Sequence, residues 1–215
     1  MELTYVGHAC FLVVSDAGTR VLLDPFQPGA FGGKIALTPF AKPVDVVVST
    51  HDHLDHFHLD DAFGHPEVVK AAGSAAGIDF AGFPLPHDAV EGKQRGMVTG
   101  FRFVLDGVTV FHPGDLGRPL TDAEAAAIAP VDVLLLPVGG TFTVDAAGAL
   151  AAMRALDPAI TIPMHYRHPR VHLPLASVDD FLAKVPRHEF AGSRIRVGAG
   201  DLRRPGKVIV METTG

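Results

Sequence analysis

The chain has 215 residues, 47% of them hydrophobic, and its acidic residues outnumber its basic residues by six. This length predicts one compact domain over residues 1–215 with a sizeable core. The acidic balance argues against a nucleic-acid partner, because general nucleic-acid-binding proteins carry a basic surplus, and no apolar run approaches the ~18 residues of a membrane span.

The first quarter of the chain reads as short β-rich runs separated by turn signals such as Gly7-His8. Strands are predicted over residues 3–6, 10–14, 20–24 and 44–49. The last of these is apolar apart from Asp45 and Ser49, as in a strand buried on both faces. The intervening stretch 25–43 is rich in Gly and Pro and carries three phenylalanines, and a loop this long is more often functional than idle.

Cys10 is the only cysteine of the chain. A single cysteine rules out an internal disulfide and fits a reducing compartment. The first residues, Met1 to Tyr5, lack the basic start and apolar run of a signal peptide. We therefore expect a soluble, cytoplasmic protein.

The second half of the chain mixes strands and helices. Asp106-Gly107 is a strong hairpin signal between two β-rich runs, 101–105 and 108–111. Further strands are predicted over residues 131–137, 160–163, 194–197 and 208–211. Helices are predicted over residues 121–128, 146–156 and 177–185, the second with Asp145 or Thr143 as its N-terminal cap. No short-period repeat is present, and strands interspersed with helices favour an α/β sandwich over an all-β fold.

Residues 49–56 read Ser-Thr-His-Asp-His-Leu-Asp-His, which places three histidines and two aspartates within six positions. Imidazole and carboxylate are the ligands that a divalent ion such as zinc prefers. His51 and His53 are two residues apart, so both rings can point the same way from an extended loop. A merely polar loop is the alternative, but the cost of desolvating so many polar groups without an ion argues against it.

This pattern of His51, His53, Asp55 and His56 resembles the signature of the metallo-β-lactamase superfamily. Other positions match that family in chain order, from Gly7-His8 to at least His165. His87 resembles the third histidine of the first metal site, Asp115 the aspartate that bridges both metals, and His165 the last ligand of the second metal. Asp24, which ends an early strand, resembles an aspartate that supports the site.

The resemblance implies an αββα sandwich of two mixed β-sheets with outer helices and the metals at one edge. It also implies two divalent ions, for which zinc is our first expectation, although the same ligands accept manganese or iron. His51, His53 and His87 would hold one ion, Asp55, His56 and His165 would hold the other, and Asp115 and a hydroxide would bridge them. Asp55 and Asp115 are the residues expected to act in catalysis.

Within that superfamily the chain resembles the small bacterial branch that includes ascorbate-6-phosphate lactonase-like proteins. The likeness rests on Gly7-His8-Ala9 and on three glycine-containing segments, at residues 92–96, 114–117 and 137–141. Many members of this branch have no assigned substrate. We expect hydrolysis of an ester, lactone or phosphoester of a small molecule, with the oligomeric state left open.

Several residues outside the ligand set are candidates for a supporting role. His8 follows a turn glycine near the metals, and Phe31, Lys93 and Arg95 are candidates for contact with substrate. His112 is either a support for the site or an ordinary histidine at the end of a strand. Gly139-Gly140 is either a tight turn or a phosphate-binding turn before a helix. The remaining histidines are expected at the surface or in local contacts: His58, His65, His168, His172 and His188. Of these, His168 and His172 follow His165 closely enough to line the pocket.

Three other functions compete with hydrolysis. An iron-based oxygen or nitric-oxide reductase of the same fold would resemble the family better with glutamate at position 53 and would need a flavin-binding partner domain. A nuclease of the superfamily would carry an additional domain or an RNA-gripping arm. A metal-binding regulatory or scaffold protein without turnover is the alternative from another class, and the complete ligand set argues against it.

Overall fold

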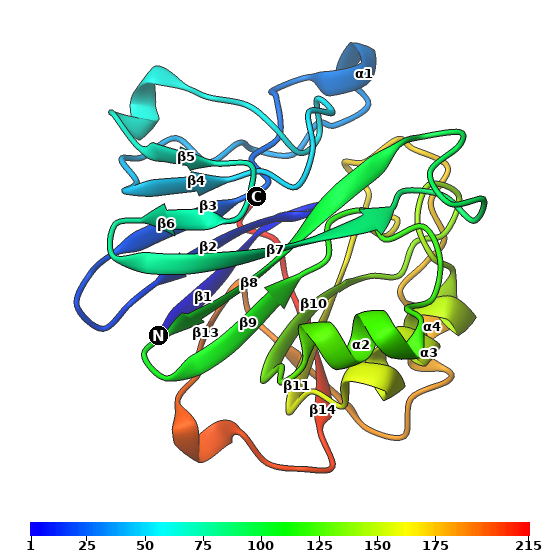
Figure 1. The fold of residues 1–215 in the computed structure, drawn as a ribbon. Helices are drawn as coiled ribbons and strands as arrows, with labels where there is room; N and C mark the ends of the chain where they lie inside the picture. Colours follow the sequence, from blue (N-terminus) through cyan, green and yellow to red (C-terminus); the bar gives the residue numbers. More distant parts are fainter.

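Two β-sheets pack face to face in the computed structural model, which describes residues 1–215 (Figure 1). The strands of the six-stranded sheet are, in spatial order, β13 (Arg194–Arg196), β1 (Glu2–Gly7), β2 (Cys10–Val14), β3 (Arg20–Leu23), β4 (Val46–Val48) and β5 (Glu67–Val69). Those of the eight-stranded sheet are β12 (His188–Ala191), β14 (Lys207–Met211), β11 (Ile160–Met164), β10 (Val133–Pro137), β9 (Val108–His112), β8 (Met97–Leu105), β7 (Ile78–Pro86) and β6 (Gly73–Ala75).

Both sheets mix parallel and antiparallel pairs. β1, β2 and β3 form an antiparallel meander, whereas β4 and β5 continue the sheet in parallel. In the larger sheet β6 to β9 are antiparallel, and β9, β10, β11 and β14 pair in parallel. The expected pair of mixed sheets is confirmed, and so is the β8–β9 hairpin, whose turn residues Asp106 and Gly107 both have positive φ.

The core between the two sheets contains 27 buried residues and draws side chains from both sheets. Strand β10 is apolar throughout because its two faces meet different cores. Val133 and Leu135 point into the core between the sheets, and Leu134 and Leu136 point toward the helices. Since one core joins both sheets, we propose that residues 1–215 form a single domain.

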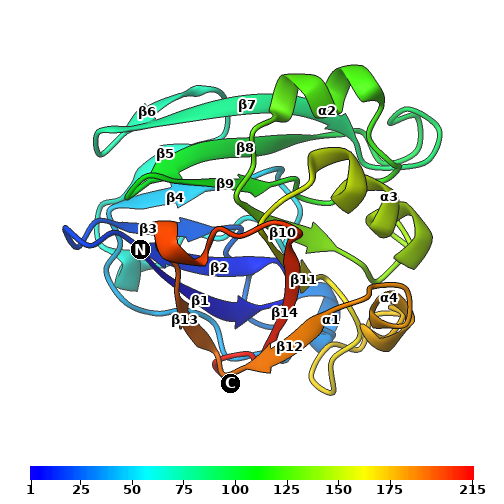
Figure 2. The same cartoon turned by 90° about the horizontal axis from the view of Figure 1, so that it is seen from below.

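The helices α2 (Asp122–Ile128), α3 (Ala146–Leu156) and α4 (Asp179–Leu182) lie together along the outer face of the eight-stranded sheet (Figures 1 and 2). Thr121 caps α2 in a capping box with Glu124, and Asp145 caps α3 by accepting two backbone N–H groups. The helix predicted over 177–185 is shorter than expected, since only Asp179–Leu182 is helical.

The outer face of the six-stranded sheet is covered mainly by loops. Twelve buried apolar residues lie under this cover, which includes the four-residue α1 (Ala30–Gly33) and the 3-10 turn Asp61–Phe63. A second 3-10 turn, Ala199–Asp201, precedes β14. The outer helices implied by the family resemblance are therefore concentrated on one side of the sandwich. No helix of the structure has the length and apolar character needed to cross a bilayer.

Strands β5, β6, β7 and β12 were not predicted from the sequence, and β7 shows why. Its sequence contains Gly82, Pro84 and Pro86, which are poor strand formers. β6 pairs only with the first residues of β7, Ile78 to Phe80, so Pro84 lies where the strand has a single neighbour. A proline is tolerated there because its missing N–H is not needed by a second strand.

Candidate metal centre

Five strand ends and one turn bring the predicted ligands, together with His8 and Asp24, to one edge of the sandwich. The turn between β1 and β2 carries His8, and Asp24 follows β3. The histidine–aspartate segment follows β4, His87 follows β7, and Asp115 and His165 follow β9 and β11. His87 is thus fixed by a regular strand, although the sequence around it shows no clear pattern.

The segment after β4 turns back on itself. The backbone N–H groups of His56 and Phe57 both donate to the carbonyl of His53, at 2.9 Å. This turn leaves Asp55 and His56 buried while His53 is exposed. One short segment therefore supplies possible ligands both to the buried part of the site, Asp55 and His56, and to its exposed part, His53.

His51, His53 and His87 form one group of possible metal ligands, with their donor atoms all within 4.8 Å of one another. Nε2 of His51 lies 2.9 Å from Nδ1 of His53, which lies 3.4 Å from Nε2 of His87. In addition, Nδ1 of His51 lies 3.0 Å from the hydroxyl of Thr50, which orients that ring.

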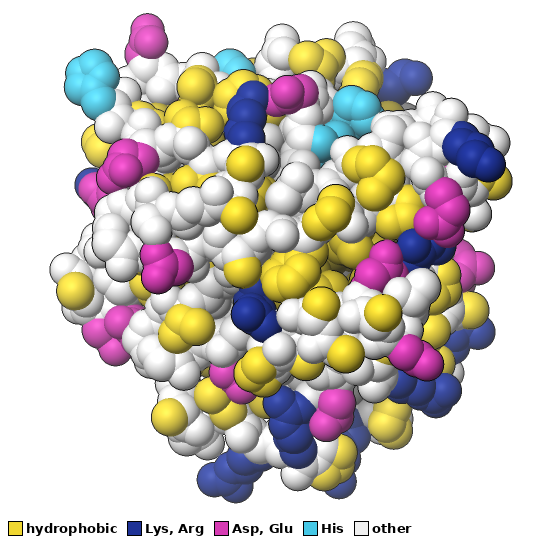
Figure 3. Space-filling model, viewed as in Figure 1, with side chains coloured by type: hydrophobic (Ala, Val, Ile, Leu, Met, Phe, Trp, Pro, Cys, Tyr) yellow, Lys and Arg dark blue, Asp and Glu magenta, His cyan; other side chains and the backbone are white.

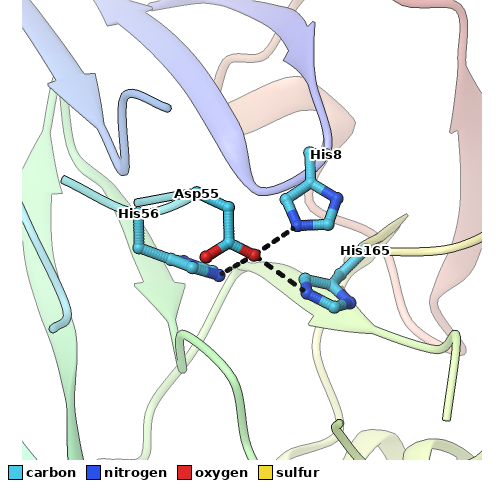
Figure 4. Close-up of side chains that lie close together, drawn as sticks. All are labelled: His8, Asp55, His56 and His165. Atoms are coloured by element: carbon cyan, nitrogen blue, oxygen red, sulfur yellow. Dashed lines mark hydrogen bonds and ion pairs between the residues drawn. The ribbon is translucent and has the colours of Figure 1, made fainter. Parts of the chain in front are cut away.

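His8, Asp55, His56 and His165 form a second group of possible ligands, all buried (Figure 4). Oδ2 of Asp55 lies 2.9 Å from Nε2 of His8, 3.6 Å from Nε2 of His56 and 3.9 Å from Nε2 of His165. The carboxylate thus lies at the centre of three imidazoles.

Asp115 joins the two groups. Its Oδ1 lies 3.1 Å from Nε2 of His56, and its Oδ2 lies 3.4 Å from Nε2 of His165 and 3.6 Å from Nε2 of His87. With His51 and His56 it also forms a third group of possible ligands. A carboxylate in contact with members of both groups has the position expected of a bridging ligand.

Asp24 supports the centre from below. Its fully buried carboxylate accepts hydrogen bonds from the backbone N–H and hydroxyl of Thr50, at 2.8 and 2.7 Å. Nδ1 of His56 lies 2.8 Å and Nε2 of His112 lies 2.9 Å from Oδ2. Asp24 therefore contacts His56 directly, and His112, the other residue predicted to support the site, lies against the same carboxylate oxygen.

Burial and charge set the protonation of the cluster. Burial disfavours the imidazolium form, so it lowers the pKa of His51 and of His165 to about 3 and also lowers that of His87. Burial acts in the same direction on His56, but Asp115 and Asp55 outweigh it and raise the pKa of His56 well above its ordinary value. His51, His87 and His165 are therefore neutral and able to bind a metal at pH 7.

The pairing of polar atoms tests whether a metal suits this site. Buried polar atoms rarely lack a hydrogen-bond partner in folded proteins. Here several atoms of the proposed ligands have none: Asp55 Oδ1, His56 Nε2, Asp115 Oδ1 and His165 Nε2. Imidazole nitrogens and carboxylate oxygens of this kind fit divalent ions, which would satisfy them.

His8 differs from its predicted role. It is 2% exposed and does not line the cavity at the site, so it has no direct access to a substrate there. Its positive φ of 57° in the β1–β2 turn directs the ring toward Asp55, and its carbonyl accepts the N–H of His165. The Gly-His pair at a turn was the signal in the sequence, but the contact with Asp55 depends on tertiary structure.

A cavity of roughly 310 Å³ opens over the ligands. Of the residues predicted to contact substrate, Phe31 and Arg95 line it, whereas Lys93 is exposed outside it because its turn is folded around the Asp88 carboxylate. In the space-filling view, histidine side chains reach the surface near the upper edge of the molecule, beside hydrophobic side chains (Figure 3). The cavity also has three lining residues that sequence reasoning missed: Lys34, Phe142 and Leu173.

Gly139-Gly140 forms a tight turn. A side chain on Gly139 would collide with the carbonyl oxygen of His165, so glycine allows the β10 and β11 ends to approach closely. The N–H of Gly140 donates to the carbonyl of Val144. In the first turn of α3, the side chain of Asp145 accepts the N–H groups of Ala147 and Gly148. These groups are therefore not free to bind a phosphate.

The other histidines lie away from the ligand cluster. His65, His172 and His188 are exposed, and His58 lies 3.7 Å from Asp60. Neither His168 nor His172 lines the cavity, although both follow His165 closely in the chain. The neighbouring Leu173 lines it instead.

Comparison with known proteins identifies the family of the chain. A sequence model described as the β-lactamase superfamily domain matches residues 2–165. A UPF0173 metal-dependent hydrolase of Carboxydothermus hydrogenoformans is 32% identical, with 77% of this chain and 84% of the relative covered.

Two solved structures extend the match over the full length. A Thermotoga maritima protein assigned to the Zn-dependent hydrolases of the metallo-β-lactamase superfamily is 32% identical, with 99% of both chains covered and a TM-score of 0.80. A metallo hydrolase of Ignicoccus hospitalis is 28% identical, with 98% of this chain and 94% of that one covered and a TM-score of 0.64.

Proposed function

Since this chain belongs to the metallo-β-lactamase superfamily and to its UPF0173 metal-dependent hydrolases, we propose that it uses two divalent ions to hydrolyse a small ester, lactone or phosphoester. The observation that carries the proposal is the division of the possible ligand atoms into two groups that share Asp115 as a common neighbour. Such a paired arrangement is typical of two-metal hydrolytic sites.

His51, His53 and His87 would hold one ion, and Asp55, His56 and His165 would hold the other, with Asp115 between them. When bound, ions of this kind lower the pKa of a water molecule from 15.7 to about 7 and so supply a nucleophile at neutral pH. Zinc is our first assignment because the ligands are mainly imidazoles, although nitrogen and oxygen ligands also accept manganese and iron.

The protein's own residues prepare the site for this chemistry. Asp24 accepts the Nδ1 proton of His56 and thereby turns Nε2 toward the cluster. His8 holds one oxygen of Asp55 and leaves the other, Oδ1, without a partner in the protein. Asp55 and Asp115 are the carboxylates we assign to catalysis, because both line the cavity in which a substrate would bind.

The size of the cavity supports a small-molecule substrate. Ligand pockets usually measure about 300–1,000 Å³, and this one lies at the small end of that range at roughly 310 Å³. The net charge of −6 favours neither a nucleic-acid partner nor an anionic membrane surface. We propose a cytoplasmic enzyme that acts on a small molecule.

A substrate screen tests the proposal. Protein loaded with zinc, and separately with manganese or iron, is assayed with 4-nitrophenyl esters, a γ-lactone and bis(4-nitrophenyl) phosphate. We expect hydrolysis of at least one class, abolished by a chelator and restored by the metal. Protein that binds two ions but hydrolyses none of these compounds would favour the regulatory or scaffold alternative.

A further inference from the structure

Two basic side chains at the cavity, Lys34 and Arg95, have no acidic partner. Neither lies within 4.0 Å of an Asp or Glu carboxylate. They differ in this from Arg118, which pairs with Glu91 and Glu124. In a protein with a net charge of −6, two unpaired cations on one cavity indicate a place for an anion.

Arg95 is carried by a turn that is organised around one carboxylate. Asp88, the residue after His87, accepts four backbone hydrogen bonds at 2.8–2.9 Å, from the N–H groups of Val90, Gly92, Gln94 and Arg95. These four hydrogen bonds to one carboxylate hold the turn closed. Because Asp88 directly follows His87, this turn fixes the position of Arg95 relative to His87, a proposed metal ligand.

The guanidinium of Arg95 is oriented by an aromatic ring. Its Cζ lies 4.7 Å from the ring centroid of Phe142. Phe142 in turn follows Thr141, whose positive φ of 58° belongs to the tight turn after β10. A stacked guanidinium keeps its N–H groups free at its edge, where they can hold a carboxylate or phosphate in two-point contact.

Lys34 and Leu173 reach the cavity together although they lie far apart in the sequence. The backbone carbonyl of Lys34 accepts the N–H of His172 at 2.8 Å, and Ile35 bridges to Val171. With Phe31 and Phe142, Leu173 supplies the apolar part of the cavity lining, beside the two cations and the proposed metal ligands. The cavity thus offers an anion site, an apolar wall and a hydrolytic centre.

We propose that the substrate of this enzyme is itself an anion. Besides the bond that is hydrolysed, it carries a carboxylate or phosphate that Arg95 and Lys34 hold, joined through a short apolar group that contacts Phe31, Phe142 and Leu173. Water adds its oxygen to the acyl carbon or phosphorus, the bond to the leaving oxygen breaks, and the leaving group takes up the proton. This inference rests on the proposed hydrolytic function.

Matched substrates test it by kinetics. The neutral 4-nitrophenyl butyrate is compared with the 4-nitrophenyl monoesters of succinate and of 3-phosphonopropionate, which separate carboxylate from phosphate-like anions. We expect the wild type to have a higher kcat/KM for an anionic ester. Because a hydrogen bond to a charged group contributes about 1.5–3 kcal/mol, Arg95→Gln and Lys34→Gln should each reduce that preference by about tenfold or more.

Lys93→Gln is the matched control, since Lys93 lies in the same turn as Arg95 but is exposed outside the cavity. It should keep the wild-type preference. If the neutral and anionic esters were hydrolysed with equal kcat/KM, the anion site would be wrong while the hydrolytic function would stand.

A binding measurement makes the test independent of turnover. Isothermal titration of metal-loaded protein with phenylphosphonate, and separately with phenylacetate, gives a Kd for each variant. We expect the Kd of at least one probe to rise about tenfold in Arg95→Gln and Lys34→Gln and to stay unchanged in Lys93→Gln. Equal Kd values in all four proteins would show that the ions alone bind the probe and would overturn the inference.

Discussion

Nδ1 of His56 lies 2.8 Å from Oδ2 of Asp24, and both side chains are fully buried. The contact leaves Nε2 as the ring nitrogen that faces Asp55 and Asp115, at 3.6 and 3.1 Å. A partner on the far side of a histidine fixes its tautomer and orientation and strengthens its binding to a metal. Asp24 therefore controls the centre without lining its cavity.

Replacement of this carboxylate should weaken metal binding. Asp24→Asn keeps the shape of the side chain but removes the charge that holds His56 and His112. Changes to such partners commonly cost about 10–100-fold in metal affinity or activity, and we expect a loss of that size. Competition with a chromophoric chelator measures the affinity.

Asp180→Asn is the control for that variant, because Asp180 is an exposed carboxylate in the first turn of α4. It should bind metal as the wild type does. Wild-type affinity in Asp24→Asn would contradict the supporting role of Asp24.

Variants at Asp115 and at Arg95 should separate effects on metal binding from effects on substrate binding. Asp115→Ala removes the carboxylate shared by both ligand groups, so we expect loss of one ion and a collapse of kcat with every substrate. Arg95→Ala should retain both ions and mainly raise KM. Phe31→Ala should behave like Arg95→Ala with substrates that carry an apolar group. Metal analysis combined with steady-state kinetics checks the three variants, and normal turnover by Asp115→Ala would refute the assignment.

Metal removal should destabilise the folded protein. A ligand that binds only the native state contributes about 2.7 kcal/mol when present at 100 times its Kd, which corresponds to roughly 5–11 °C in melting temperature for a domain of this size. We expect a chelator to lower the melting temperature by this order and added zinc to restore it. Scanning calorimetry on protein with verified metal loss provides the measurement, and an unchanged transition would count against the site.

The metal-free protein should lose stability as the pH falls from 7 to 5. Burial holds the pKa of His51 and His165 at about 3, whereas histidine in an unfolded chain titrates near 6.5. Below pH 6.5 the unfolded chain therefore binds more protons than the folded one, and stability decreases by roughly 2–4 kcal/mol by pH 5. His56, with its raised pKa, stays protonated in the folded state and opposes the effect while its unfolded counterpart titrates near pH 6.5, but this one group is outweighed by His51 and His165 together.

Chelated protein melted at a series of pH values tests this dependence. His165→Asn, which has no titrating ring, should reduce the slope. A melting temperature that is flat or rises toward pH 5 would contradict the neutral state of His51 and His165 in the folded protein.

The sequence predicted what is local and missed what depends on tertiary contacts. His51, His53, Asp55 and His56 lie within six residues, and their chemistry is visible in the sequence alone. The buried strands β4 and β10 were also predicted, because their continuous apolar runs reflect two buried faces. Strand β7 was missed because its prolines disfavour a strand. They are tolerated only because that part of β7 pairs with β8 on one side and has no strand on the other.

The cavity illustrates the same limit. Lys34, Phe142 and Leu173 come from three separate loops and share no pattern in the sequence. Lys93 and Arg95 could not be distinguished, because only the closed turn around Asp88 determines which of them reaches the cavity. His8 carried a turn signal, but its contact with Asp55 joins residues 47 positions apart.

The metal content of the purified protein tests the central claim most directly. Protein prepared without chelators, and again after reconstitution with zinc, is analysed by inductively coupled plasma mass spectrometry against its concentration. The two ligand groups joined by Asp115 predict about two divalent ions per chain. Folded protein that holds one ion or none after reconstitution would contradict the two-metal centre on which the proposed hydrolysis depends.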